Sequence, residues 1–177
     1  ILFISAGALT NEGYFDNVGR TRRDGLELGI RGVGGERISW FVNFTDLDAS
    51  FSESVALPSP NNPAAINGEV LVSPGDSLPL VPEQLLKGGL RVELSERLSL
   101  GADVVGGSDF HMRGDEGNDL EKIGVYFVVN LRGELRVSDS VRVFLNIDNL
   151  LDKEYETFGL FGEADEVLGD DFEDSRF

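Results

Sequence analysis

Hydrophobic and polar side chains alternate one by one along most of this 177-residue chain. In residues 141–148, VRVFLNID, the odd positions are apolar and the even positions are polar, with the exception of Phe144. The same period of two runs through residues 26–31, 38–45, 86–94, 98–104 and 125–137. A period of two is typical of β-strands whose two faces meet different surroundings, and no segment shows a convincing helical period. The sequence therefore predicts an all-β fold.

The predicted strands are joined by connections that alternate in length. All six prolines lie between Pro58 and Pro82. Because proline lacks the N–H group that a sheet ladder needs, residues 52–83 are expected to form one long loop. Further long connections are expected at about 108–122 and 153–177, and short ones near 32–36, 95–97 and 138–140. Short turns alternating with long loops are typical of an antiparallel up-and-down barrel in an outer membrane.

Strand length and hydropathy favour this transmembrane barrel over the alternative, a soluble β-sandwich. Residues 124–137 are long enough to cross a bilayer at a tilt, whereas strands of soluble proteins usually have about five to six residues. No uninterrupted apolar run approaches the roughly 20 residues of a membrane helix. The mean hydropathy of −0.09 is compatible with alternating membrane strands. In a sandwich, the polar faces of the strands would lie in bulk solvent.

In a membrane barrel, one face of each strand lines a polar lumen and the other contacts lipid. We expect lumen-facing side chains at Lys87, Arg91, Arg132, Glu134 and Arg136. We expect lipid-facing side chains at Trp40, Val42, Phe44, Leu131, Leu135, Val143 and Leu145. Trp40 is also a candidate for an aromatic girdle at the membrane interface.

Composition excludes several classes of function. The chain has no cysteine, so it holds neither a disulfide framework nor a thiolate metal site. Its formal net charge is −17, and no basic patch is present that would bind nucleic acid. No cofactor is expected.

The chemistry of single residues points to no enzyme. His111 is the only histidine, and no serine and acid are arranged with it as in a hydrolase triad. Asp109, Asp115, Glu116 and Asp119 lie near it, but their spacing does not fit a calcium-binding loop, so a solvated acidic loop is the favoured interpretation. Residues 113–115 spell Arg-Gly-Asp, a tripeptide short enough to arise by chance. We therefore expect no metal site and no catalytic residue, and ligand-contacting residues stay unassigned.

Three segments resemble the C-terminal barrel strands of TonB-dependent outer-membrane receptors. They are NVGRTRRDGLELGIRG at residues 17–32, RISWFVNFTDLDASF at 37–51 and NIDNLLDKEYETFG at 146–159. In the last of them, Asn149 to Lys153 and Tyr155 match the family's Asn-Leu-Phe/Leu-Asp-Lys-x-Tyr segment. The residues before Phe177 do not alternate as the family's closing strand does.

The resemblance implies that residues 1–177 are the C-terminal part of a receptor barrel, about seven of 22 strands, with the first incomplete and the closing strand missing. The plug domain would lie outside this chain. The implied function is uptake of a scarce nutrient, such as a ferric siderophore or another metal chelate, across the outer membrane of a Gram-negative bacterium. The implied partners are membrane lipid, the small-molecule ligand and, through the plug, the inner-membrane TonB complex. A passive porin or adhesin with the same barrel is the alternative within the membrane class.

Overall fold

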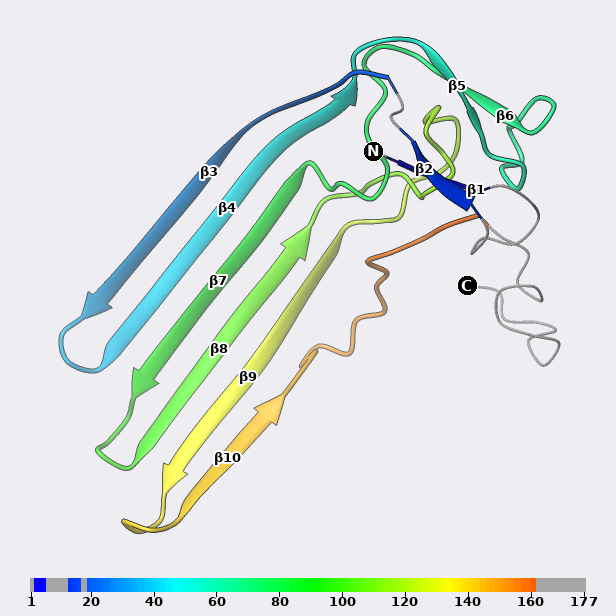
Figure 1. The fold of residues 1–177 in the computed structure, drawn as a ribbon. Coiled ribbons are helices and arrows are strands. Elements are labelled where there is room, and N and C mark those ends of the chain that lie inside the picture. The colour runs from blue at the N-terminus through cyan, green and yellow to red at the C-terminus, as the bar shows by residue number, and fades with distance from the viewer. Residues whose placement is uncertain (1, 6–12, 17–18, 162–177) are drawn as a thin grey trace, which may run out of the picture.

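The computed structural model describes residues 2–5, 13–16 and 19–161, and every regular element in them is a β-strand (Figure 1). Six strands form the main sheet in the order β10-β9-β8-β7-β4-β3, each antiparallel to its neighbours. They are β3 (Thr21–Gly34), β4 (Ile38–Phe51), β7 (Gln84–Glu93), β8 (Leu98–Gly107), β9 (Tyr126–Arg136) and β10 (Arg142–Ile147). The predicted all-β, up-and-down antiparallel architecture is confirmed. Within the described residues, no helix has the length and apolar character to cross a membrane.

The longest strands match the thickness of a bilayer. β3 and β4 have 14 residues each and pair over their whole length, from Thr21 with Phe51 to Gly34 with Ile38. At a rise of about 3.3 Å per residue each strand is about 46 Å long. A strand of that length, tilted by about 45°, spans the roughly 30 Å of a hydrocarbon core.

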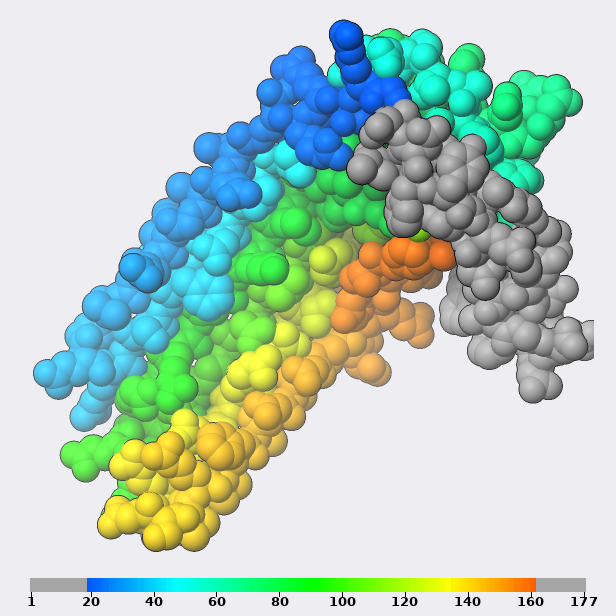
Figure 2. All heavy atoms as spheres, viewed as in Figure 1, coloured from blue at the N-terminus to red at the C-terminus, as the bar shows by residue number. Residues whose placement is uncertain are grey.

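The sheet is open. β3 and β10 are its two edges, and within the described residues neither pairs with a further strand of the main sheet. Figure 2 shows the six strands as one continuous layer, coloured in chain order from blue to yellow. An open six-stranded sheet is what a segment of a larger barrel wall looks like, since a barrel closes only when its first and last strands meet.

The two ends of the sheet differ in the length of their connections, as predicted. Tight turns join β3 to β4, β7 to β8 and β9 to β10 at one end (Figure 1). In the first of these turns, Gly35 has φ of +63°, a conformation that glycine adopts without the steric cost of a Cβ. The long connections leave from the opposite end, together with the small strands β1, β2, β5 and β6.

The structure differs from the expectation at two places. Residues 52–83 are not purely loop, because β5 (Val55–Pro58) and β6 (Glu69–Val72) form a two-stranded sheet within them. Pro58 is compatible with this pairing because it lies at the end of a short edge strand. The N-terminal strand β1 (Leu2–Ser5) is not the incomplete first strand of the main sheet, since it pairs with β2 (Gly13–Asp16) in a separate hairpin.

Candidate functional site

The strand register divides the main sheet into a polar face and an apolar face. Directly paired residues of antiparallel strands lie on the same face, so the pairs Lys87–Val105, Arg91–Gly101 and Arg132–Gly101 connect one face across β7, β8 and β9. The polar face carries all five residues predicted to line a lumen, Lys87, Arg91, Arg132, Glu134 and Arg136. The apolar face carries all seven predicted to contact lipid, Trp40, Val42, Phe44, Leu131, Leu135, Val143 and Leu145. The assignment of these faces to lumen and lipid stays a prediction.

Charged side chains on the polar face pair with one another across strands. Arg91 lies 2.7 Å from Glu93 on its own strand and 3.4 Å from Glu134 on β9. Arg142 of β10 approaches the same Glu134 at 3.5 Å. The arginines are about half exposed, so each pair contributes little stability by itself. Together, these pairs balance the positive charges of the arginines with the negative charges of the glutamates on this part of the polar face.

A second set of contacts surrounds Arg132. Its Nε donates to Asp103 at 3.0 Å, and its Nη2 lies 3.8 Å from Asp148 just beyond β10. The Asp103 carboxylate also accepts a hydrogen bond from Asn130 Nδ2 at 2.7 Å. Neither Asp103 nor Asn130 was singled out from the sequence as a site residue, because their role depends on a register that strand alternation alone does not give.

The polar face is hollowed. A depression of about 800 Å³ is lined by Arg31, Phe41, Arg91, Arg132, Glu134 and Phe144, among others. Gly101 pairs with Arg91 on one side and with Arg132 on the other, so no side chain fills the depression between the two arginines. Phe41 and Phe144 are exposed aromatic residues that lie among the charged side chains lining the depression. Their position in the alternation was the one sequence signal for them, since Phe144 interrupts the polar positions of its strand.

Aromatic rings of the sheet lie over glycines of the neighbouring strand. Phe41 is paired with Gly89 and Tyr126 with Gly107 on the polar face. A Cβ at Gly107 would lie 2.6 Å from the Tyr126 ring, and one at Gly89 would overlap the Phe41 ring. The glycines therefore make room for the rings, which shield the exposed backbone and help to fix the register.

The segment from 52 to 83 packs onto the polar face at the end that carries the long connections. Ala49 and Phe51 lie on the polar face of β4, and both are buried. They form a hydrophobic core with residues of the long connection, namely Leu57, Val70, Val72 and Leu78. The character of this face therefore changes along β4. Its side chains are polar at Asn43 and Thr45 and apolar beyond Thr45, where the long connection covers them.

The segment from 108 to 122 is docked onto the segment from 52 to 83 by hydrogen bonds. The Asn118 amide accepts from the Ser77 N–H at 2.6 Å and donates to the Ser77 carbonyl at 3.0 Å. The Gly114 carbonyl accepts from Ser59 Oγ and from Asn62 Nδ2, both at 2.7 Å. We call residues 59–80 and 108–122 together the cap. Its two halves meet through complementary polar groups, and no loop composition rule could have predicted this pairing.

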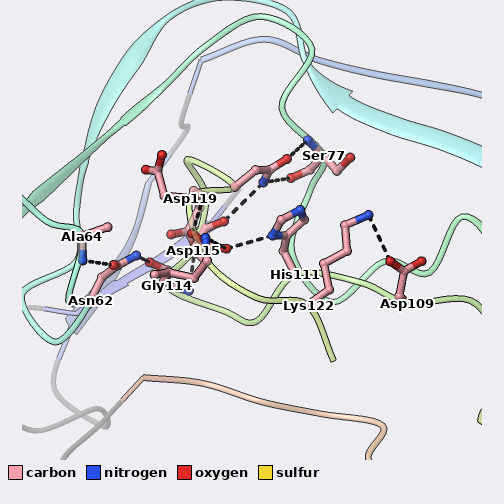
Figure 3. Close-up of polar contacts among 12 residues, drawn as sticks. Asn62, Ala64, Ser77, Asp109, His111, Gly114, Asp115, Asp119 and Lys122 are labelled. Atoms are coloured by element: carbon pink, nitrogen blue, oxygen red, sulfur yellow. Dashed lines mark hydrogen bonds and ion pairs between the residues drawn. The ribbon is translucent and has the colours of Figure 1, made fainter. Parts of the chain in front are cut away.

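Buried titratable groups lie inside the cap. Figure 3 shows Asp115 between His111 and Asp119, with His111 Nδ1 at 2.8 Å from Asp115 Oδ2. Asp115 is fully buried and also accepts hydrogen bonds from the N–H groups of Asp119 and Leu120, at 2.9 and 3.3 Å. The neighbouring Glu116 is only 4 % exposed. Burial raises the pKa of the Glu116 carboxyl above its ordinary value, against backbone hydrogen bonds and the charge of Arg113, which lower it.

These contacts bear on two chemistries considered from the sequence. Asp109 pairs with Lys122 at 3.4 Å while Asp115 pairs with His111, so the acidic side chains have different partners. In the described part of the chain, no group of three or more His, Cys, Asp or Glu side chains is arranged to hold a metal ion. The Arg-Gly-Asp tripeptide is not presented to a partner, because the Asp115 side chain lies in the interior.

The segment that follows β10 is held by its asparagine. Asn149 has φ of +51°, its Oδ1 accepts from the Lys153 N–H at 3.0 Å, and its Nδ2 donates to the Lys153 carbonyl at 2.9 Å. Its own N–H donates to Asn130 on the polar face at 2.9 Å. Further on, Tyr155 stacks on Tyr126 with ring centroids 5.6 Å apart. These contacts give a physical reason for the Asn-Leu-Leu-Asp-Lys motif; of the predicted connection 153–177, residues 162–177 lie outside the described residues.

Comparisons with known proteins agree with this architecture. Residues 3–150 match the family described as TonB dependent receptor-like, beta-barrel. No curated protein matches the chain. The fold is similar to that of the ferric yersiniabactin uptake receptor FyuA from Yersinia pestis, with a TM-score of 0.62 and 19% identity, over 80% of this chain and 20% of FyuA. It is also similar to the copper transporter OprC, with a TM-score of 0.60 and 21% identity, over 92% of this chain and 22% of OprC.

The match covers most of this chain but little of the larger proteins. The chain spans about a fifth of the length of FyuA and of OprC. At these identities the two structures support the fold alone, and the family match over 148 of the residues supports membership. The resemblance found in the sequence is confirmed. The chain belongs to the TonB-dependent receptor-like β-barrel family, whose members are outer-membrane transport receptors of Gram-negative bacteria rather than enzymes.

Proposed function

We propose that this chain forms part of the barrel wall of a receptor that takes up a scarce nutrient with energy from the TonB complex. The observation that carries the proposal is the separation of the sheet into a polar and an apolar face over six consecutive strands of a family member. The polar face lines the lumen and the apolar face contacts lipid. The plug and the contact with the TonB complex belong to parts of the receptor beyond residues 1–177.

The cap lies on the outer side of the membrane in this proposal. Barrels of this type have short turns on the periplasmic side and long loops outside, so the long connections 52–83, 108–122 and 153–177 face the surroundings. The hydrophobic core that Ala49 and Phe51 form with residues of the long connection lies on the polar face of β4 and therefore narrows the mouth of the lumen. A ligand entering the barrel passes these residues first.

The charge of the cap favours a nutrient that is not anionic. In the cap, residues 59–80 contain two acidic residues and no Lys or Arg, and residues 108–122 contain five acidic residues and two basic ones. A barrel entrance lined by charges of one sign raises the local concentration of oppositely charged ligands and lowers that of ligands with the same charge. We therefore infer a metal chelate, such as a ferric siderophore, whose net charge is zero or positive. The printed names of FyuA and OprC, one for a ferric chelate and one for copper, support a metal-containing nutrient.

Uptake by the complete receptor tests the proposal. In the test variant, a short Gly-Ser linker replaces residues 55–80. Uptake of radioactive iron from a panel of ferric siderophores is measured in cells with and without the TonB complex. We expect energy-dependent uptake by the unmodified receptor and its loss in the deletion variant, while the barrel remains folded. Replacing the short turn 95–97 by a Gly-Ser turn is the matched control and should leave uptake intact. Uptake that persists in cells without the TonB complex would point instead to a passive porin, and uptake retained after the deletion would refute the role of the cap.

A further inference from the structure

The cap contains a buried carboxyl group, that of Glu116. Glu116 is 4 % exposed and stands between Asp115, which is fully buried, and Gly117, where a Cβ would lie 3.1 Å from the Leu71 carbonyl oxygen of the other half. Its Oε1 accepts the Gly114 N–H at 3.2 Å. The carbonyl of that same Gly114 accepts the two hydrogen bonds that Ser59 and Asn62 donate across the junction. Glu116 therefore contacts the residue through which one half of the cap holds the other.

Two charged residues of its own segment act on Glu116. From its own segment, Arg113 favours the charged form of the carboxylate and Asp115 opposes it. His111 faces Asp115. The other half of the cap contributes Ser59, Asn62 and Ser77 to the junction, and these side chains are uncharged. Residues 59–80 contain no Lys, Arg or His, so no cation from that half compensates the loss of water around Glu116.

We propose that Glu116 makes the docking of the two halves of the cap depend on protons, so that acid closes the cap and neutral or basic conditions loosen it. A buried carboxyl group is more favourable in its neutral form, because burial removes the water that stabilises the charge. When residues 108–122 separate from residues 59–80, Glu116 regains that water. Separation is therefore easier when Glu116 is ionised.

The direction of the pH effect follows from the change in proton affinity. Burial raises the pKa of Glu116 in the docked cap, so the docked form binds the proton more tightly than the separated form. Its stabilising contribution is complete below about pH 4.3, the ordinary value for an exposed glutamate. It is lost as the pH rises through the raised pKa of the docked form. This inference concerns the cap alone and does not depend on which nutrient the receptor carries.

Hydrogen exchange at the junction tests the proposal in the complete receptor. The Ser77 N–H is bonded to Asn118 and the Leu80 N–H to the His111 carbonyl at 2.9 Å, so both amides are protected only while the cap is docked. Protection, corrected for intrinsic exchange, is compared at about pH 5 and about pH 7.5, both above the ordinary pKa of an exposed glutamate. We expect protection to fall with rising pH by about tenfold for each unit by which docking raises the pKa.

Two isosteric substitutions separate Glu116 from the other acidic residues of the segment. Glu116→Gln should remove the pH dependence and leave both amides strongly protected at either pH, because the neutral amide keeps the shape without the buried charge. Glu121→Gln, at an exposed position of the same segment, should behave as the unmodified receptor does. Amides of β8 report whether the barrel itself stays folded. Protection that is independent of pH in the unmodified receptor, or a fall that persists in Glu116→Gln, would overturn the proposal. A fall abolished only by His111→Asn would assign the effect to histidine and overturn it too.

Discussion

A pair of neighbouring residues on β10 distinguishes a membrane wall from a soluble sheet. Leu145 lies on the apolar face opposite Gly133, and Phe144 lies on the polar face opposite Glu134. Their exposed fractions are similar, 50% and 62%. Packing within the chain therefore predicts that arginine lowers stability by similar amounts at Leu145 and at Phe144. A large difference would come from the medium on each side of the sheet.

The expected cost of Leu145→Arg follows from its depth in the bilayer. Leu145 is four residues beyond Val141, which lies in the short turn, so a rise of about 3.4 Å and a tilt of about 40° place it about 10 Å from that end. Arginine on the lipid face costs about 2–4 kcal/mol at the midplane and about 0–1 kcal/mol near the interfaces. We expect about 2 kcal/mol at Leu145, a roughly 30-fold change in the folding equilibrium. Phe144→Arg should cost less than about 0.5 kcal/mol, because it places a cation in a wet lumen opposite a carboxylate.

The assay is unfolding of the complete receptor in lipid vesicles by urea, with Leu145→Gln as the control for lost packing against Gly133. Leu145→Arg should lower the midpoint more than Leu145→Gln does, and Phe144→Arg should leave it almost unchanged. Equal effects of the two arginine substitutions would contradict the assignment of the apolar face to lipid. A larger effect at Phe144 would reverse the assignment.

Two further predictions concern polar contacts. Arg132→Glu places a third carboxylate beside Asp103 and Asp148, and we expect this repulsion to weaken the contact between the barrel and the plug. Cells with the complete receptor should then become more permeable to antibiotics, whereas the control Arg97→Glu, in a short turn, should not change their permeability. Unchanged permeability in Arg132→Glu would argue against a plug contact. Asn149→Ala removes both hydrogen bonds to Lys153 and replaces asparagine, which tolerates positive φ, by a residue that disfavours it. The 149–153 turn should therefore lose about 2 kcal/mol, and the Asp152 amide, which is bonded to the Asn149 carbonyl, should exchange roughly 30-fold faster. Asn149→Gly should lose less, and equal rates in the alanine variant and the unmodified receptor would count against the turn's dependence on the side chain.

The strands and their faces could be predicted from the sequence because they depend on a local rule. Alternation at residues 141–148 requires no knowledge of the neighbouring strand, and once two strands pair, the parity of each fixes which side chains share a face. The family motif at residues 149–153 was also recognisable in the sequence, and the two hydrogen bonds between Asn149 and Lys153 that shape it are local. The long connection 52–83 could be predicted from its prolines, and the other connections from where the alternation stops.

The cap could not be predicted in the same way. Its contacts join Ser77 with Asn118 and Gly114 with Asn62, residues 41 and 52 positions apart. Such pairs arise from backbone geometry in connections that have no repeating pattern. The long proline-containing segment looked like a structureless loop, although Val70 and Val72 alternate with exposed positions in a short strand and supply its core. The burial of Asp115 and Glu116 could not be predicted either, because acidic residues in a loop are usually solvated.

The central claim is that the apolar face meets lipid and the polar face meets water, and single cysteines along β9 test it directly. Residues 1–177 contain no cysteine. Once any cysteine elsewhere in the complete receptor is replaced by serine, each position from 126 to 137 can carry one spin label in the receptor reconstituted in lipid vesicles. Collision with oxygen, which concentrates in lipid, and with a water-soluble nickel chelate is measured at every position. The account predicts a period of two, with oxygen dominant at Val129, Leu131 and Leu135 and nickel dominant at Asn130, Arg132 and Glu134. Nickel access at both sets, or the opposite phase, would contradict it.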